Sequence, residues 1–276
     1  MTNVRFGLNH ITCPGEDIAG LAALAQKLGI TDVEIRNDVA NQPLSDGTAG
    51  ADVAPVLASA GLKVLTVNAL QRFNEWDDER AADAEELARE TAASGAEALV
   101  LCPVNEGGWR TEPGAREASL REALAGLLPI LRRHGLKGYV EALGFPISSL
   151  RYKRDAVEAI DAVDGADTLF LIHDTFHHAI ANDPDMYPTR TGLVHMSGVE
   201  PDPALAKDDM LDGHRVLVGA HDALDNLGQI AAMLKGGYNG AFSYECFAGS
   251  VHSDPALAES LAASMDYIRT NVAITA

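Results

Sequence analysis

The chain repeats one local pattern along most of its length: an amphipathic helical stretch ends near a glycine, and a short apolar strand follows within a few residues. ALAQKLG, for example, leads into ITDVEIR, and ELARETAASG leads into AEALVLCP. Glycine suits the end of a helix because it has no Cβ and adopts the left-handed conformation at little cost. The regular alternation of helices and strands predicts an α/β fold built on parallel strands.

Eight strands are predicted in this way, with helices in most of the gaps. They are residues 4–9, 32–37, 63–68, 98–103, 137–141, 168–174, 192–197 and 241–246. The weakest helix lies between the sixth and seventh strands, where AIANDPDMYPTR offers only a short turn or helix. Eight units without a linker or compositional break predict a single domain, residues 1–276, folded as a (β/α)8 TIM barrel. An open doubly wound sheet is the alternative, but the first strand leads into LNHITCPGED and lacks a glycine-rich phosphate loop.

Three polar residues are placed to begin helices. Asp17, Ser119 and Asp254 each precede a stretch rich in alanine and leucine, so we predict that they cap helix N-termini. Pro255 then fits the first helical turn, where its missing N–H is not needed.

Composition and charge limit the classes of partner. The chain has 276 residues, 47% of them hydrophobic, which is enough for a large packed core. Its formal net charge is −19, and the Lys and Arg residues are scattered among Asp and Glu, so we expect no binding to nucleic acid. No apolar run approaches the roughly 20 residues of a membrane-spanning helix, so we expect no membrane association.

The cysteines and the N-terminal residues favour the cytoplasm. Cys13, Cys102 and Cys246 are odd in number and far apart, which argues against a disulfide framework or a cysteine zinc site. The start MTNVRFGLNH lacks the basic and apolar regions of a signal peptide. We therefore predict a cytoplasmic protein, and a homo-oligomer is compatible with the sequence.

Ligand-type side chains follow several predicted strands at their C-terminal ends, where a TIM barrel carries its chemistry. The run LFLIHDTFHH begins as a buried strand and finishes in a carboxylate and three imidazoles. The same design recurs in LKGYVEALGF, TGLVHMSGVE and GAFSYECF. We predict that these segments bring four residues to one divalent metal ion: Glu141, Asp174, His195 and Glu245.

The alternation of side chains along strands supports convergence at the barrel axis. Tyr139 shares a face with Glu141, and Leu193 shares a face with His195. Three carboxylates near the axis would repel one another, and ionised carboxylates are costly to bury unpaired. A divalent cation removes that conflict, and three carboxylates with one imidazole suit Mn²⁺, Zn²⁺, Mg²⁺ or Co²⁺.

Two buried salt bridges without a metal are the alternative. In that case Glu141 and Glu245 would pair with Arg36 and Arg215. Polar residues at other strand ends are expected to line the pocket, and we single out Asn9, His10, Arg36 and Asn68.

The ordered set of motifs resembles the xylose-isomerase-like TIM barrel superfamily over nearly the whole chain. The segments that carry the resemblance are VEIRND (33–38), VEALGF (140–145), HDTFHH (173–178), LVHMSGV (193–199), DGHRVLVG (212–219) and SYECF (243–247). Within the superfamily, the chain looks most like the inosose (2-keto-myo-inositol) isomerases. Hydroxypyruvate isomerases and ketose 3-epimerases are more distant relatives.

The resemblance implies roles for particular residues. Glu141, Asp174, His195 and Glu245 would bind the metal, and the two glutamates would also act as acid and base. His177 and Arg215 would bind substrate oxygens. Two departures weaken an epimerase assignment: Val218, Gly219 and His221 stand where epimerases carry a Pro-Gly-x-Gly turn, and Gly198 stands where many relatives have an acidic residue.

The resulting expectation is a metal-dependent sugar or polyol isomerase of inositol or carbohydrate metabolism. It would move a ketone along an inosose or related keto-sugar by proton transfer through an ene-diolate. The alternatives are a ketose 3-epimerase, a hydroxypyruvate isomerase, and a keto-inositol or dehydroshikimate dehydratase. More remote are an endonuclease IV-like phosphodiesterase and a sugar-binding barrel without catalysis. The endonuclease is disfavoured because Asn68 and Pro103 stand where its cluster has histidines.

Overall fold

The computed structural model describes residues 4–272, and within them eight parallel strands close into one barrel. The strands neighbour one another in chain order, and the last pairs with the first, with Gly7 opposite Ser243. They are β1 (Phe6–Asn9), β2 (Asp32–Arg36), β3 (Lys63–Gln71), β4 (Ala98–Cys102), β5 (Lys137–Glu141), β6 (Leu169–Asp174), β7 (Thr191–Met196) and β8 (Phe242–Tyr244). The predicted (β/α)8 barrel is confirmed.

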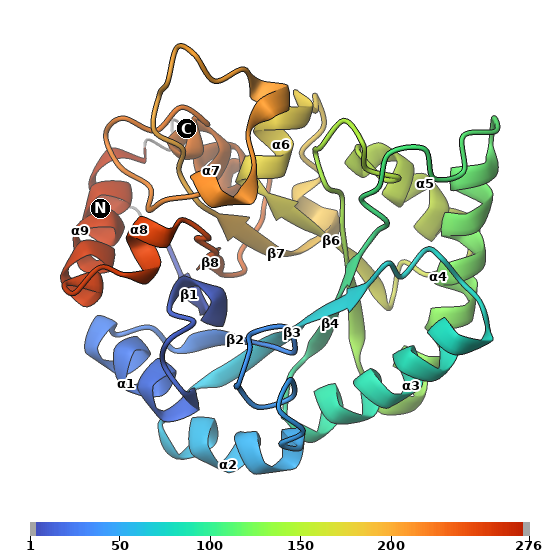
Figure 1. Cartoon of the computed structure of the whole chain (residues 1–276), viewed down its shortest axis with the longest axis horizontal. Helices are drawn as coiled ribbons and strands as arrows, with labels where there is room; N and C mark the ends of the chain where they lie inside the picture. Colours follow the sequence, from blue (N-terminus) through green and yellow to red (C-terminus); the bar gives the residue numbers. More distant parts are fainter. Residues whose placement is uncertain (1–3, 273–276) are drawn as a thin grey trace.

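Helices surround the barrel on its outside, as the view along the barrel in Figure 1 shows. They are α1 (Ile18–Leu28), α2 (Gly50–Ser59), α3 (Asp78–Ala93), α4 (Ala115–His134), α5 (Lys153–Ala162), α6 (Thr175–Ala181), α7 (Asn226–Lys235), α8 (Gly249–His252) and α9 (Leu257–Asn271). α1 and α4 end at Gly29 and Gly135, both left-handed, as the glycine pattern predicts.

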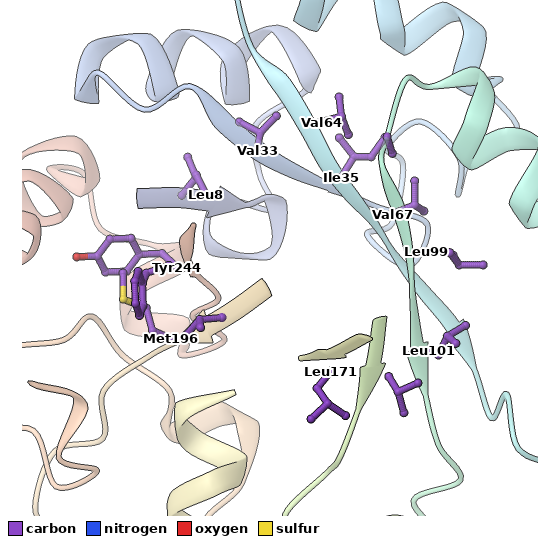
Figure 2. Packing of buried hydrophobic residues seen from close by; sticks show 14 of the residues in the cluster. Leu8, Val33, Ile35, Val64, Val67, Leu99, Leu101, Leu171, Met196 and Tyr244 are labelled. Carbon is purple, nitrogen blue, oxygen red and sulfur yellow. The ribbon is translucent and has the colours of Figure 1, made fainter. Parts of the chain in front are cut away.

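The main apolar core lies between the strands and the helices. Figure 2 shows side chains from this layer, including the pairs Val33 with Ile35 and Leu99 with Leu101. Members of each pair are two residues apart and therefore share the outer face of their strand. Val100, which lies between Leu99 and Leu101, belongs instead to a small cluster inside the barrel.

The barrel interior changes from apolar to polar along its axis. At its N-terminal level, Leu65, Leu193 and Ala241 pack together with the ring of Tyr139. Further along the same strands, the interior positions are taken by carboxylates, an imidazole and other polar groups. The predicted strand faces hold for β5 and β7, because Tyr139 and Leu193, which were expected to share faces with Glu141 and His195, pack inside the barrel.

Several local predictions need correction. α6 begins directly after β6 and carries His177 and His178, so it starts ahead of residues 179–190, where a short turn or helix was expected. Of the predicted caps, Asp17 is confirmed by its bond to the N–H of Gly20. Ser119 lies inside α4, where its hydroxyl donates to the carbonyl of Asn74. Asp254 lies in a turn ahead of α9 and accepts from the N–H of Ala256.

Candidate metal centre

The four predicted ligands meet at the C-terminal mouth of the barrel. Glu141, Asp174, His195 and Glu245 each offer one ligand atom, and these atoms all lie within 4.8 Å of one another. All four side chains are buried. Residues from four successive strands thus form one compact group of three carboxylates and one imidazole.

Strand pairing places these side chains side by side. Glu141 and Asp174 are the last residues of β5 and β6, and His195 lies opposite Asp174 in the β6–β7 register. Glu245 directly follows β8, and its N–H donates to the carbonyl of Met196, which continues the ladder to β7. The backbone hydrogen bonds of the barrel therefore set the positions of the ligand atoms.

Asp174 also begins the helix that follows it. Its Oδ1 accepts from the N–H groups of Phe176 at 2.7 Å and His177 at 3.0 Å, so it is the N-cap of α6. Its other oxygen, Oδ2, lies 2.6 Å from Arg215 Nη2. The Asp174 carboxylate thereby connects three features: the ligand group, the start of α6 and a buried guanidinium.

His195 lies at the centre of the group and is fully buried. Its Nδ1 is 3.2 Å from both Glu141 Oε1 and Glu245 Oε2, while Nε2 faces Glu34 Oε2 at 3.0 Å. Burial alone would lower the pKa of His195, but the charges of Glu245 and Glu34 raise it well above the usual range. Burial raises the pKa of Glu245, yet the charges of His195 and Arg215 bring it well below its usual range.

The salt-bridge alternative is found for one of its two glutamates. Glu245 receives Arg36 Nη1 on Oε1 at 2.8 Å and Arg215 Nη2 on Oε2 at 2.9 Å. Glu141 pairs with neither arginine among the described contacts; its oxygens face His195 and the thiol of Cys102, at 3.2 and 3.3 Å. The arginines therefore occupy one side of the ligand group and leave the Glu141 side to the cavity.

The charges and the donor geometry fit a divalent cation. Four buried carboxylates, including Glu34, outnumber the two buried guanidiniums, so negative charge remains whether or not His195 is protonated. Zinc ligand atoms lie about 2.0–2.2 Å from the ion, which puts neighbouring ligand atoms roughly 3–4 Å apart. The 3.2 Å separations around His195 Nδ1 match this spacing. The residues present thus fit one metal ion.

A cavity of about 380 Å³ opens above the ligand group. Its lining includes both glutamates of the group and four of the residues predicted to line the pocket or bind substrate: Arg36, Asn68, His177 and Arg215. His10 does not line it, because its ring turns to the carbonyl oxygen of Glu16 at 2.7 Å. A larger hollow of about 560 Å³ beside α3 contains none of the predicted site residues, so volume alone would not identify the site.

His177 and Phe247 shape the wall of this cavity. The His177 ring packs edge-on against Phe145 and Phe176, and its Nδ1 has no protein hydrogen-bond partner. The ring of Phe247 lies under both arginines, with centroid distances of 5.5 Å to Arg36 and 4.8 Å to Arg215. These aromatic rings fix the cationic side of the cavity.

Sequence reasoning gave no role to Glu34 or Cys102. Glu34 was visible as a polar residue within a predicted strand. Its partner, His195, lies on a strand that is not a neighbour of β2 in the barrel. The Cys102 thiol donates to Glu141 Oε2, and its pKa is raised well above the usual range by burial and by the charge of Glu141. The cysteine at the end of β4 was missed because only carboxylates and imidazoles were considered as ligands.

The fold and the site together define a class: single-domain (β/α)8 barrels with a carboxylate–imidazole cluster at the C-terminal mouth. The chain belongs to the xylose isomerase-like TIM barrel family, whose sequence model matches residues 22–270. A comparison with curated proteins gives no match.

Solved structures of similar fold cover almost the whole chain. A xylose isomerase domain-containing protein from Salmonella typhimurium LT2 is 27% identical, with a TM-score of 0.88 and 99% coverage of both chains. The IolI protein, solved with a bound zinc atom, is 20% identical, with a TM-score of 0.83 and coverage of 99% and 100%. D-Allulose 3-epimerase from Methylomonas sp., in complex with D-allulose, is 18% identical, with a TM-score of 0.68 and coverage of 96% and 94%.

Across residues 4–272, none of the helices combines the length and the apolar character that crossing a bilayer requires.

Proposed function

We propose that this protein is a divalent-metal-dependent isomerase of a small keto-polyol, with an inosose as the first substrate to test. The observation that carries the proposal is the charge balance of the site, in which buried carboxylates outnumber the buried guanidiniums beside a polar cavity. A zinc atom in the similar IolI structure and a ketose in the similar epimerase complex support this assignment. One bound ion, Mn²⁺, Zn²⁺, Mg²⁺ or Co²⁺, would be held by Glu141, Asp174, His195 and Glu245.

A divalent ion at this position supplies electrophilic polarisation of the substrate carbonyl and of the neighbouring hydroxyl. The protein side chains then perform the proton transfers. Glu141 removes the proton from the carbinol carbon and returns it to the former carbonyl carbon, while Glu245 stays ionised between Arg36 and Arg215. The hydroxyl proton passes between the two substrate oxygens, so the ketone moves by one carbon through an ene-diolate.

The contacts of the two glutamates support Glu141 as the group that carries the proton. Glu141 makes no described contact with a guanidinium, and its carboxylate borders the cavity. Glu245 is held by Arg36 and Arg215 on both oxygens. Those guanidiniums also place positive charge where the ene-diolate develops negative charge. His177 lines the same cavity, and we assign it to bind a substrate hydroxyl.

Solvent deuterium exchange tests the proposal. Wild-type protein loaded with Mn²⁺ should introduce deuterium at carbon in an inosose, and Glu141→Gln or Glu245→Gln should abolish this exchange. Glu259→Gln is a suitable control because that exposed residue pairs with Lys27 outside the barrel mouth. Exchange that survives both site substitutions would contradict the proposal, and a product lighter by one water would replace isomerisation with dehydration.

A further inference from the structure

Glu34 joins two strands that are not neighbours in the barrel. It lies on β2, and its carboxylate reaches His195 on β7, with Oε2 at 3.0 Å from Nε2. β1 and β8 lie between these strands in the barrel order. Glu34 is fully buried and does not line the cavity, so it has no access to a substrate there.

Two further donors hold the Glu34 carboxylate in place. Thr66 Oγ1 donates to Oε2 at 2.5 Å, and Asn68 Nδ2 donates to the same oxygen at 2.9 Å. Asn68 also donates to Thr66 Oγ1, at 2.8 Å. Both residues lie on β3, and Thr66 is the register partner of Glu34. The side chain that faces His195 is therefore fixed by the adjacent strand.

This arrangement decides which nitrogen of His195 can bind a metal. An ionised carboxylate only accepts hydrogen bonds, so Nε2 carries the proton that faces Glu34. In the neutral imidazole Nδ1 then holds the lone pair, and Nδ1 is the atom between Glu141 and Glu245. A carboxylate behind a ligating histidine fixes the tautomer and the ring plane and strengthens the other nitrogen as a donor.

We propose that Glu34 is a positioning residue that holds His195 with Nδ1 directed at the metal ion, and that Thr66 and Asn68 support it. This inference rests on the proposed metal centre. It also gives Asn68 a structural task in addition to its place on the cavity wall. A role confined to core stability makes a different prediction, because it leaves metal affinity unchanged.

Cobalt binding separates these possibilities without an activity assay. Metal-free wild-type protein, Glu34→Met and Glu34→Gln are titrated with Co²⁺, and the dissociation constant and the visible absorption of the bound ion are recorded. Loss of the carboxylate in Glu34→Met should weaken binding by about 10- to 100-fold and alter the absorption. The Co²⁺ affinity of Glu34→Gln should fall between those of wild type and Glu34→Met, because its amide oxygen still accepts from Nε2 while the charge is lost.

Asp32→Asn is the matched control. Asp32 lies two residues earlier on β2 and is also buried. It pairs with Arg5 at the N-terminal end of the strand, away from the barrel mouth, and Arg5 Nε lies 2.7 Å from Asp32 Oδ2. This variant should bind Co²⁺ as tightly as wild type even if it is less stable. Wild-type affinity and absorption in Glu34→Met would overturn the role of Glu34 and leave the metal centre intact.

Two other outcomes are decisive. If wild-type protein does not bind Co²⁺, the proposed function and this inference both fall. If Glu34→Met does not fold, Glu34→Gln decides: an intermediate affinity supports the inference, and wild-type affinity overturns it.

Discussion

Arg215 donates to Asp174 across 2.6 Å, and both side chains are buried at the end of β6. The same guanidinium nitrogen reaches Glu245 at 2.9 Å, so one cation joins two of the four proposed metal ligands. Arg215 thus fixes the spacing of these carboxylates and offsets part of their charge. The remaining charge is left for the metal ion.

Replacement of Arg215 should destabilise the metal-free protein. Removal of one partner of a buried ion pair typically costs about 3–5 kcal/mol, because the remaining charge is left uncompensated. Arg215→Gln should therefore lower the free energy of unfolding by about that amount, measured by urea denaturation. Addition of Mn²⁺ should then raise the melting temperature more than in wild type, because the ion compensates the same carboxylates.

The control for this variant is Arg190→Gln, which removes a surface pair with Asp161. Exposed pairs contribute about 0–1 kcal/mol, so its unfolding should change little. Equal unfolding curves for Arg215→Gln and wild type would refute the stabilising role of Arg215.

Cys102 should influence catalysis through its bond to Glu141. In Cys102→Ser a hydroxyl still donates to Oε2, whereas Cys102→Val removes the donor and keeps a similar volume. We expect Cys102→Val to lower kcat by about tenfold, which corresponds to roughly 1.4 kcal/mol in the barrier, and Cys102→Ser to lower it less. Steady-state kinetics at saturating metal provide the measurement. If both variants had the kcat of wild type, the thiol would have no role in catalysis.

Gly144 should tolerate no side chain. A Cβ there would lie 2.1 Å from the carbonyl oxygen of His177 and 2.6 Å from Ile180 Cγ1, so α6 would have to move. Gly144→Ala should cost about 1–3 kcal/mol of stability and raise KM, because His177 is displaced. In Gly107→Ala the nearest atom is Ile147 Cγ2 at an ordinary 3.6 Å, and this control should behave as wild type. A Gly144→Ala variant with unchanged melting temperature and KM would contradict this packing argument.

His178 should make stability depend on pH. Burial, then the charge of Lys153 at 2.8 Å, lowers the pKa of His178 to about 4. Between pH 6.5 and 4 the unfolded chain therefore binds a proton that the folded chain does not. Stability is complete above pH 6.5 and falls as the pH decreases, by at most about 3 kcal/mol from this group.

Urea denaturation of the metal-free protein at pH 7 and pH 4.5 measures this effect. His178→Asn should lose less stability over that interval than wild type. Parallel losses in the two proteins would exclude His178 as a source of the pH dependence.

The fold and the ligand group followed from periodic features of the sequence. Alternation along β5 and β7 placed Glu141 and His195 on the inner face, and the structure brings these residues together with Asp174 and Glu245. The N-cap role of Asp174 was not predicted, although an aspartate directly before a helical segment is an N-cap signal.

Other features depend on distances through space. The Glu34–His195 contact joins residues 161 positions apart on strands that are not paired, so no local pattern predicts it. Arg215 lies in the long loop after β7, and its contacts depend on how that loop folds back over the mouth. His10 was expected in the pocket, but a 3-10 turn begins at this residue and its ring faces the carbonyl of Glu16.

The central claim is that the excess negative charge of the barrel mouth binds one divalent ion. Isothermal titration of metal-free protein with Mn²⁺ or Zn²⁺, in wild type and in Asp174→Asn, tests it most directly. We predict one ion per chain in wild type and much weaker binding in Asp174→Asn. An absence of binding in wild type, or equal binding in both proteins, would contradict the claim.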